Sequence, residues 1–360
     1  MSYSGVEMLP DALRQELHIL LGDKGLFIGE EAALRSNATH NVPACAVLAA
    51  PRTVDQVSGI LKACNRHFRP VAIQGGLTGL VQGASVQPGE IAISLAGLAD
   101  IEDIDTVGRT ITLQAGVILE VAQRAAASHG LLLSADWGAR GTGTIGGGVP
   151  TKGGGNNVLR YGMMRDQVLG TEVVLADGTV LNSMNRLIKN NAGYDLKHLF
   201  IGSEGTLGVI TRAVLRLRPA PTTTQTALVG CASMPQVINL LDILSRELGG
   251  SLTSFEVMWK SFYRLIVSHG PHLPALSDHH PIYVLVEAHG FSSESDEVNF
   301  VETLGSLINQ GNISEAVLCS SETQRVALWA VRDDITTLNR ALDPMITYDV
   351  SLPIGSVERY

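Results

Sequence analysis

The stretch that decides the fold is GARGTGTIGGGVPTKGGGNNVLRYG, Gly138–Gly162, the densest run of glycine in this 360-residue chain. Within it, the string Gly141–Gly146 reads G-x-G-x-x-G, the pattern of the dinucleotide-binding fingerprint. That fingerprint requires a strand before it and a helix that opens at its third glycine. Because more glycines and a proline follow up to Gly155, we expect no helix here. The sequence therefore predicts another use for this bare backbone.

Composition and charge narrow the class of protein. The net charge is −9 at pH 7, whereas nucleic-acid-binding surfaces are basic, so we expect no nucleic-acid partner. No apolar run approaches the roughly 20 residues of a membrane-spanning helix, and the N-terminus lacks the pattern of a signal peptide. The cysteines are far apart and form no C-x-x-C pair, which indicates reduced core thiols in a cytoplasmic protein. They are Cys45, Cys64, Cys231 and Cys319.

A histidine-rich segment, SHGPHLPALSDHHP, raises the question of a metal site. Its histidines are His269, His272, His279 and His280, and prolines interrupt them. Their spacing matches no helix face, whereas zinc ligands usually recur at short, regular intervals. The sequence favours a solvated loop, and we expect no metal.

The hydrophobic pattern divides the chain into three parts. Residues 1–45 form an N-terminal helical segment, residues 46–221 alternate strands with helices, and residues 222–360 form a second domain. Near the start of the first domain, the apolar positions from Val54 to Cys64 share one helical face, with Thr53 as the expected N-cap. Further on, Asp177-Gly178 predicts a hairpin with a two-residue type I′ turn.

The second domain shows the order strand-helix-strand-strand-helix-strand over residues 226–320. This is the order of the ferredoxin-like, split βαβ motif. We expect one longer helix over residues 321–342 to follow, and then a final strand over residues 345–354. The predicted fold class is therefore α+β, with a ferredoxin-like domain in the second half.

Two glycine-rich loops need a common explanation: residues 74–85, QGGLTGLVQGAS, and residues 138–162. Glycine accepts positive φ and carries no side chain, so successive backbone N–H groups can converge into a nest that binds an anion. Plain connections between strands need only about two to six residues, and the second loop is far longer. We therefore prefer a phosphate-bearing ligand to a pair of ordinary tight turns.

The order of motifs resembles the PCMH-type FAD-binding domain of the vanillyl-alcohol oxidase superfamily. The motifs are QGGLTGL, TITLQAG, TIGG followed by GGGNNVLRYG, EVVLADG and GYDLKHLFIGSEGTLGVIT. Within the superfamily the chain is most similar to the D-2-hydroxyacid dehydrogenases, which act on D-lactate, D-2-hydroxyglutarate or glycolate. The resemblance covers about Val47 to Pro353. It implies a two-subdomain FAD-binding domain followed by a cap domain.

The resemblance also implies where FAD binds. The first loop would bind the pyrophosphate, the second would pass along the ribityl chain and the isoalloxazine, and the strand at GVIT would meet the adenosine end. Because the first loop has no histidine for covalent attachment, we expect non-covalent FAD. One departure is TKGGG, Thr151–Gly155, where many relatives have T-N-A-G-G. The expected cofactor-binding residues are Gln74, Gly75, Gly76, Leu77, Thr78, Gly79, Ser85, Gly141, Thr144, Ile145, Gly146, Gly147, Tyr161, Gly162, Val209 and Ile210.

Oxidation of a 2-hydroxy acid needs a cation for the substrate carboxylate, and arginine binds carboxylates through two parallel hydrogen bonds. Arg332 and Thr336 are four residues apart and would share one face of a helix. By spacing alone, Arg332 could equally pair with neighbouring acids. The resemblance favours the catalytic role, because the family's arginine and threonine have this spacing after a SEAQ-like string, here Ser321–Gln324. For His289, which follows a strand, we favour a structural role over that of a base.

Two departures from the family leave a second hypothesis open. Thr347 stands where relatives usually have lysine, and relatives continue beyond the equivalent of Tyr360 with an H-x-G-D-G-N-x-H-like string that supplies zinc ligands and a base. We therefore expect a C-terminally incomplete cap. The first hypothesis is an FAD-dependent D-2-hydroxyacid dehydrogenase with an unidentified electron acceptor. The second is a flavin-binding but catalytically incomplete chain, a truncated product or a subunit like the shorter FAD component of glycolate oxidase.

These hypotheses leave the assembly open, either a homodimer or a complex with a partner subunit. A third reading is a sugar-nucleotide reductase built on the same FAD domain. It fits the second half of the chain poorly because the pattern of the cap differs.

Overall fold

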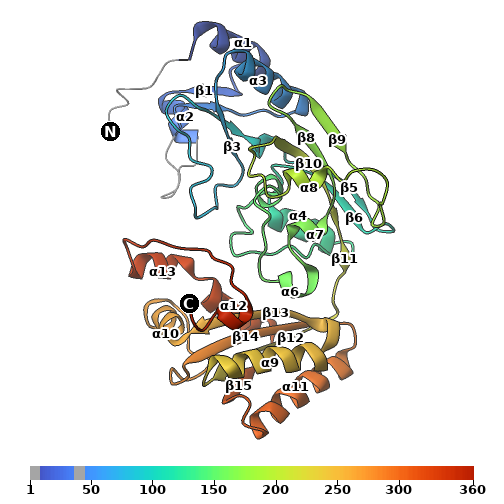
Figure 1. Ribbon diagram of the computed structural model, residues 1–360, viewed down its shortest axis with the longest axis vertical. Helices are drawn as coiled ribbons and strands as arrows, with labels where there is room; N and C mark the ends of the chain where they lie inside the picture. The colour runs from blue at the N-terminus through green and yellow to red at the C-terminus, as the bar shows by residue number, and fades with distance from the viewer. Residues whose placement is uncertain (1–8, 36–44) are drawn as a thin grey trace. The chain divides into compact units, whose positions relative to one another are not determined.

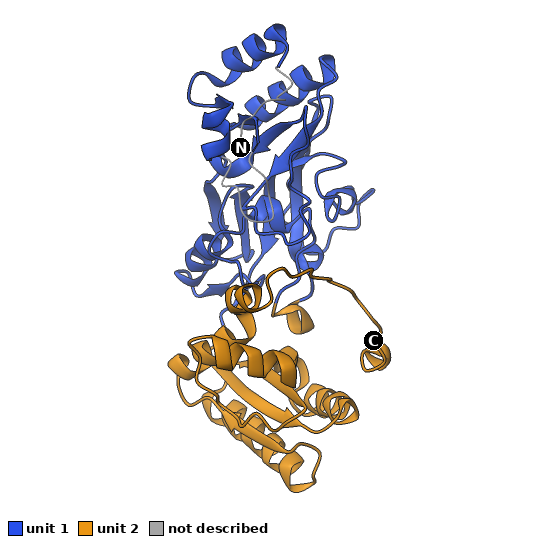
Figure 2. Cartoon of the chain, turned by 90° about the vertical axis from the view of Figure 1, so that its left-hand side faces the viewer, with its two compact units in different colours: residues 1–155, 162–220 blue, residues 156–161, 221–360 orange. Residues whose placement is uncertain are grey.

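The computed structural model describes residues 9–35 and 45–360 (Figure 1). The chain divides into two compact units, which Figure 2 shows in different colours. Unit 1 is Met1–Gly155 with Gly162–Ala220, and unit 2 is Asn156–Tyr161 with Pro221–Tyr360. The piece Asn156–Tyr161 thus belongs to unit 2 by its contacts, although it interrupts unit 1 in the sequence.

Unit 1 starts with a four-stranded sheet in the order β1-β2-β4-β3, in which β2, β4 and β3 run parallel. Helix α3 packs its apolar side into the core beside this sheet, with Val57 and Ile60 fully buried. At its start Thr53 Oγ1 accepts a hydrogen bond from the Gln56 amide (3.2 Å), which confirms the predicted N-cap. The elements are α1 (Asp11–Leu21), β1 (Leu26–Ile28), α2 (Glu30–Arg35), β2 (Val47–Ala49), α3 (Val54–Arg66), β3 (Val71–Gln74), β4 (Ile91–Ser94) and the 3₁₀ turn η1 (Leu95–Gly97).

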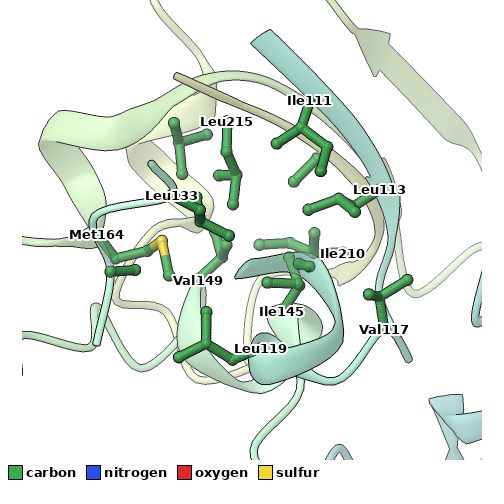
Figure 3. Packing of buried hydrophobic residues seen from close by; sticks show 14 of the residues in the cluster. Ile111, Leu113, Val117, Leu119, Leu133, Ile145, Val149, Met164, Ile210 and Leu215 are labelled. Carbon is green, nitrogen blue, oxygen red and sulfur yellow. The ribbon is translucent and has the colours of Figure 1, made fainter. Parts of the chain in front are cut away.

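A second, antiparallel sheet of unit 1 has five strands in the order β5-β6-β10-β8-β9. Its inner side chains form an apolar core with helices of the same unit, and Figure 3 shows Ile111, Leu113 and Ile210 from the sheet meeting Ile145 and Val149. The elements are β5 (Ile101–Asp105), β6 (Thr110–Gln114), α4 (Leu119–Ala127), β7 (Leu131–Leu132), α5 (Ile145–Gly148), α7 (Met164–Gln167), β8 (Val168–Val174), β9 (Val180–Ser183), α8 (Lys197–Phe200), β10 (Val209–Arg216) and β11 (Arg218–Pro219).

The hairpin between β8 and β9 is confirmed, but its predicted turn type is wrong. A type I′ turn needs positive φ at both central residues, whereas the backbone of this turn has positive φ at Gly178 (81°) and not at Asp177. The Gly178 amide donates to Leu175 O and the Leu175 amide to Thr179 O, both at 2.8 Å. This is a three-residue loop that ends in a left-handed glycine, and the extra residue widens the turn.

Unit 2 is built on a four-stranded antiparallel sheet in the order β13-β14-β12-β15. With the strands counted along the chain, this is the ferredoxin-like arrangement that the sequence predicted. Helices α9 and α11 pack their apolar sides on one face, and α10 and α12 pack on the other. The elements are α6 (Val158–Tyr161), β12 (Thr223–Cys231), α9 (Met234–Glu247), η2 (Gly249–Ser251), β13 (Leu252–Trp259), α10 (Lys260–His269), β14 (Ile282–Gly290), α11 (Ser293–Asn309), β15 (Glu315–Leu318), α12 (Glu322–Asp333), α13 (Ile335–Ala341) and η3 (Ile354–Ser356).

Three expectations for local structure are wrong. The single helix expected over residues 321–342 is divided into α12 and α13, because Asp334 leaves the helical conformation (φ −78°, ψ 69°) and caps α13 by accepting from the Thr337 amide (2.8 Å). The strand expected over residues 345–354 is absent, and this described segment is mostly exposed and pairs with no sheet. In unit 1, the one-turn helix α5 occupies the glycine stretch where we expected none.

Candidate functional site

The loop between β3 and β4 offers a row of backbone donors. None of the N–H groups of residues 75 to 84 donates a hydrogen bond to an acceptor in the described part of the chain. Within this loop Leu77 and Gln82 have positive φ (55° and 59°). Such a conformation costs a non-glycine residue about 1–3 kcal/mol and clusters at binding sites. Free donors on a strained backbone point to a ligand that accepts hydrogen bonds.

Side chains at the two ends of this loop have different roles. Gln74 is buried, and its Nε2 donates to Ala84 O (3.1 Å), so the amide closes the loop on itself. Ser85 Oγ is buried and has no hydrogen-bond partner among the described residues. A buried hydroxyl left without a partner costs about 1–3 kcal/mol. The Ser85 hydroxyl is therefore suited to a bound ligand, whereas the Gln74 amide is already used.

Around α5 the N–H groups of the second glycine loop donate to main-chain acceptors of the protein. The Ile145 amide donates to Val117 O (2.9 Å) and the Gly146 amide to Ala115 O (2.6 Å). Thr144 caps α5, because its Oγ1 accepts from the Gly147 amide at 3.2 Å. These tertiary bonds explain why a helical turn forms through glycines of poor intrinsic propensity. The part of the second loop around α5 therefore has its donors engaged, whereas the N–H groups of residues 75 to 84 have no acceptor among the described residues.

The two glycine loops meet backbone to backbone. A Cβ built on Gly76 would lie 2.1 Å from Thr142 O, and one built on Gly75 would lie 2.7 Å from Thr144 Oγ1. Real Cβ atoms do not approach other atoms so closely, so glycine is required at both positions for this close approach. The structure therefore brings together the two loops that the sequence singled out, although they are far apart along the chain.

A third loop, between α8 and β10, borders the first, and the sequence did not assign site residues to it. Glu204 in this loop has positive φ (51°), and its amide donates to Pro150 O of the second loop (3.1 Å). A Cβ on Gly83 would lie 3.4 Å from Glu204 Oε2. The signal was present in the string FIGSEGTLG, whose glycines Gly202 and Gly205 also have positive φ (92° and 81°).

These features fit a diphosphate-bearing ligand. The first loop supplies unpaired N–H groups and the Ser85 hydroxyl, all of which donate, and a diphosphate accepts. Of the cations that flank the loops, Arg140 is already paired with Asp136 (3.1 Å). Backbone dipoles would therefore hold most of the negative charge, as the glycine content predicted.

The remaining expected cofactor residues fall into different surroundings. Val209 and Ile210 begin β10 with buried side chains, so only their main chain could reach a ligand. Gly141 is exposed, whereas Ile145 is part of the core. Tyr161 belongs to unit 2, and the other residues of the set belong to unit 1.

In unit 2 a buried carboxylate organises the sheet face under α12. Glu287 of β14 accepts hydrogen bonds from Trp329 Nε1 (2.7 Å), Thr226 Oγ1 (2.9 Å), Arg325 Nη1 (3.2 Å) and His289 Nε2 (3.2 Å). Burial opposes its ionisation, but the hydrogen bonds from His289 and Trp329 and the charge of Arg325 outweigh burial and hold the pKa of Glu287 at about 2. Glu287 is therefore ionised at neutral pH and anchors α12 to the sheet.

The expected carboxylate-binding residue, Arg332, follows on the same side of α12. Its Nε and Nη2 donate to Glu256 Oε2 of β13 (2.9 and 2.7 Å), and its Nη1 donates to Asp333 Oδ1 (3.1 Å). Burial disfavours the charged guanidinium, but the two carboxylates overcome this effect and raise the pKa of Arg332. The side chain is about one-third exposed (33%) and remains accessible to a ligand.

Thr336 does not share a helix face with Arg332. The break at Asp334 separates α12 from α13, and Thr336 lies exposed in the first turn of α13. The buried neighbour Thr337 lies against the core instead. A signal for this break was present in the sequence, because aspartate is a favoured N-cap and Asp334 stands three residues before Thr337.

His289 is buried and has a partner at each ring nitrogen. Its Nε2 lies 3.2 Å from Glu287 Oε1, and its Nδ1 lies 3.2 Å from the Tyr161 hydroxyl. A carboxylate accepts a hydrogen bond from Nε2, and the Tyr161 hydroxyl lies within hydrogen-bond distance of Nδ1. This arrangement agrees with the structural role that we favoured for His289. It also ties Tyr161 to the sheet of unit 2.

Comparison with known protein families shows which domains this chain contains. The fold and the two glycine loops are those of a protein that binds a diphosphate-bearing cofactor. Residues 45–183 match the FAD binding domain family, and residues 220–360 match the C-terminal domain of FAD linked oxidases. The chain therefore carries an FAD binding domain followed by the C-terminal domain of FAD linked oxidases, and FAD is its cofactor.

The chain is similar over most of its length to curated proteins from distant organisms. It is 39% identical to a putative mitochondrial D-lactate dehydrogenase of Schizosaccharomyces pombe over 84% of this chain and 58% of the relative. It is 39% identical to the mitochondrial D-2-hydroxyglutarate dehydrogenase of Bos taurus (86% and 56%) and 34% identical to the D-2-hydroxyglutarate dehydrogenase of Xanthomonas citri (87% and 65%). The chain thus spans somewhat more than half the length of these relatives.

Solved structures support the fold. An alkyldihydroxyacetonephosphate synthase matches 95% of this chain and 68% of its own with a TM-score of 0.73 at 17% identity. p-Cresol methylhydroxylase matches 86% of this chain and 65% of its own with a TM-score of 0.70 at 19% identity. At such low identity these matches concern the architecture alone.

Two further expectations concern thiols and membranes. All four cysteines lie in the described residues and none of them forms a disulfide; Cys45, Cys64 and Cys231 are buried and Cys319 is half-buried. Burial raises the pKa of the Cys64 and Cys231 thiols to about 11, so they stay protonated and inert. Among the described residues, no helix combines the length and the apolar character needed to cross a bilayer.

Proposed function

We propose that this protein is an FAD-dependent dehydrogenase that oxidises a D-2-hydroxy acid to the 2-oxo acid. The α-hydrogen leaves as a hydride, the hydroxyl proton goes to a base, and the electrons pass to an acceptor still to be identified. When bound, FAD supplies the hydride acceptor at its N5. The observation that carries the proposal is the loop of residues 75–84, whose N–H groups have no acceptor among the described residues.

Different groups would bind the cofactor and the substrate. The loop after β3 and the Ser85 hydroxyl bind the diphosphate of FAD, and FAD is held non-covalently because this loop contains no histidine to attach the flavin. Arg332 binds the substrate carboxylate through its guanidinium, which has the planar pair of donors that carboxylates fit. Thr336 would add a hydroxyl from a separate helix, so its contribution is smaller than one shared helix face would imply.

The relatives support the choice of substrate class. Two kinds of activity are named among them, D-lactate dehydrogenase and D-2-hydroxyglutarate dehydrogenase, and both substrates are D-2-hydroxy acids. Glycolate, the third substrate that the resemblance implies, shares the 2-hydroxycarboxylate group. We keep as a second candidate a chain that binds FAD without completing turnover, because His289, the histidine we considered as a base, is buried with both ring nitrogens engaged.

The proposal is tested by anaerobic titration of the FAD-loaded protein. D-lactate, glycolate and D-2-hydroxyglutarate are added in turn while the flavin absorbance is recorded. Bleaching by one of them is the expected result and names the substrate. A bound flavin that dithionite bleaches but none of the acids does would support the second candidate instead. A protein that takes up no FAD would contradict both.

We also propose an intracellular location, because the four cysteines form no disulfide with one another. The names of the relatives from Schizosaccharomyces pombe and Bos taurus place those proteins in mitochondria. Fractionation of cells that express the natural gene decides between the cytoplasm and an organelle.

A further inference from the structure

Arg332 and Arg325 lie on one side of α12, seven residues apart, and each donates to a glutamate of the sheet beneath. The two glutamates, Glu287 of β14 and Glu256 of β13, lie on the same sheet face, because Ser254 is the register partner of Glu287 and Glu256 is two residues further along. An arginine of α12 thus pairs with a glutamate of the sheet at two places, Arg325 with Glu287 as the first copy and Arg332 with Glu256 as the second. The two copies differ in burial and in how many carboxylate oxygens are used.

The first copy is saturated. Glu287 has a side chain only 5% exposed, and both of its oxygens accept hydrogen bonds. Removing such a partner would leave buried charges unpaired, which is strongly unfavourable. A dissolved carboxylate cannot displace Glu287 from Arg325 at low cost, so this ion pair persists when a ligand is present.

The second copy is incomplete. Glu256 is 23% exposed, and Arg332 Nε and Nη2 both converge on its Oε2. Its Oε1 has no hydrogen-bond partner among the described residues. Arginine binds a carboxylate best when two parallel N–H groups meet two oxygens. A free carboxylate could therefore make the better pair with Nε and Nη2, and water can reach the exposed atoms during the exchange.

We propose that Glu256 is a placeholder for the substrate carboxylate: it neutralises Arg332 while the site is empty, and a small carboxylate ligand replaces it on Nε and Nη2. The proposal rests on the proposed function, since it takes Arg332 as the group that binds the substrate. Glu256 then sets the affinity for substrate by competition. It keeps the guanidinium charged, paired and correctly oriented between turnovers.

The test measures carboxylate binding directly, with pyruvate as the probe. Pyruvate is the product of D-lactate oxidation and cannot reduce the flavin, so calorimetric titration of the FAD-loaded protein reports binding alone. Glu256→Gln removes the competing charge and keeps the size of the side chain. We expect it to bind pyruvate about tenfold more tightly than the unchanged protein. Glu256→Asp keeps the charge and withdraws it by one methylene, so we expect an intermediate affinity.

Two controls show whether the effect acts through Arg332. Glu322→Gln makes the same charge change on α12, where Glu322 pairs with Arg325 at the exposed end; we expect its pyruvate affinity to stay within twofold of the unchanged protein. The double variant Glu256→Gln with Arg332→Ala should lose the gain. An equal gain from Glu322→Gln would mean that general charge, and not exchange, is responsible.

The proposal is overturned if Glu256→Gln binds pyruvate no better than, or less well than, the unchanged protein. It is also overturned if neither protein binds pyruvate. Either result is compatible with flavin reduction by a hydroxy acid, which would keep the proposed function intact. Conversely, a gain through Arg332 in a protein whose flavin no hydroxy acid reduces would keep the exchange and reject the dehydrogenase.

Discussion

The loop after β3 in unit 1 and the sheet face under α12 in unit 2 both gather polar groups, but they use different parts of the chain. The loop presents main-chain N–H groups and the Ser85 hydroxyl, and no charged side chain lies within its residues 75–84. The sheet face presents side chains, namely the carboxylates of Glu287 and Glu256 with the arginines above them. A site made of main-chain groups should lose binding when a side chain is added to a glycine. A site made of charged side chains should lose its contacts when one of the charges is removed.

The largest effect is expected where the backbone site has no room. Gly76→Leu would place its Cβ 2.1 Å from Thr142 O, a main-chain atom that cannot turn away. The two glycine loops would have to separate, so we expect no FAD to remain after gel filtration, measured as the ratio of absorbance at the flavin and protein bands. The matched control is Gly305→Ala on α11, where a Cβ meets no atom within 4 Å. A yellow Gly76→Leu protein with one FAD per chain would contradict the role assigned to this contact.

The next effect comes from removing charge in unit 2. Glu287→Gln leaves Arg325 without its buried partner, and such losses cost about 3–5 kcal/mol in stability. We expect a lower free energy of unfolding, measured by urea denaturation with tryptophan fluorescence as the signal. Glu322→Gln, which removes an exposed partner of the same arginine, should cost less than about 1 kcal/mol. Equal losses in the two variants would remove the distinction between a fixed pair and an exposed one.

The same carboxylate predicts a pH dependence. The pKa of Glu287 is lowered from 4.5 to about 2 in the folded protein, with the hydrogen bonds from His289 and Trp329 outweighing burial. Its stabilisation is therefore fully present above about pH 4.5 and is lost as the pH falls towards 2, and it is of the order of 3 kcal/mol. We expect the unfolding free energy of the unchanged protein to fall over this interval more steeply than that of Glu287→Gln. Parallel curves would show that another group controls acid stability.

Much of the architecture follows from local patterns. The helix after Thr53 and the ferredoxin-like order of unit 2 are confirmed because hydrophobic periodicity and capping are short-range signals. The helix α10 had no assignment, although Tyr263 and Ile266 are buried three residues apart and Gly270 ends it. The break at Asp334 was missed because the apolar spacing continues across it, while the cap decides the boundary.

The candidate sites were predictable to different degrees. Glycine-rich stretches are visible directly in the sequence, so the two loops that meet at Gly76 could be predicted as a site. The partners of Arg332 could not, because Glu256 is 76 residues away and only the register of β13 and β14 brings it under α12. Short α5 was missed for the same reason: its stability comes from tertiary bonds to Ala115 and Val117 and not from its residues.

The smallest effect should come from a side chain of the backbone site, the Ser85 hydroxyl. Ser85→Ala removes a hydroxyl that has no partner among the described residues, so folding should be unharmed. We expect FAD to bind about threefold to tenfold more weakly, the worth of one hydrogen bond, as measured by quenching of flavin fluorescence. Ser245→Ala on α9, whose hydroxyl donates to Leu241 O, serves as the control. A loss as large as that of Gly76→Leu would mean that side chains, and not main chain, hold the cofactor.

The most direct test of the division between the two units is Arg332→Ala measured beside the unchanged protein in one anaerobic experiment. Flavin content is read first, and then the absorbance change on adding D-lactate, glycolate or D-2-hydroxyglutarate. The account predicts two equally yellow proteins, of which only the unchanged one is bleached by an acid, with a loss in the variant of about 100-fold or more in the rate of reduction. Bleaching of Arg332→Ala at an undiminished rate would contradict the assigned substrate site, and loss of its FAD would contradict the separation of the two roles.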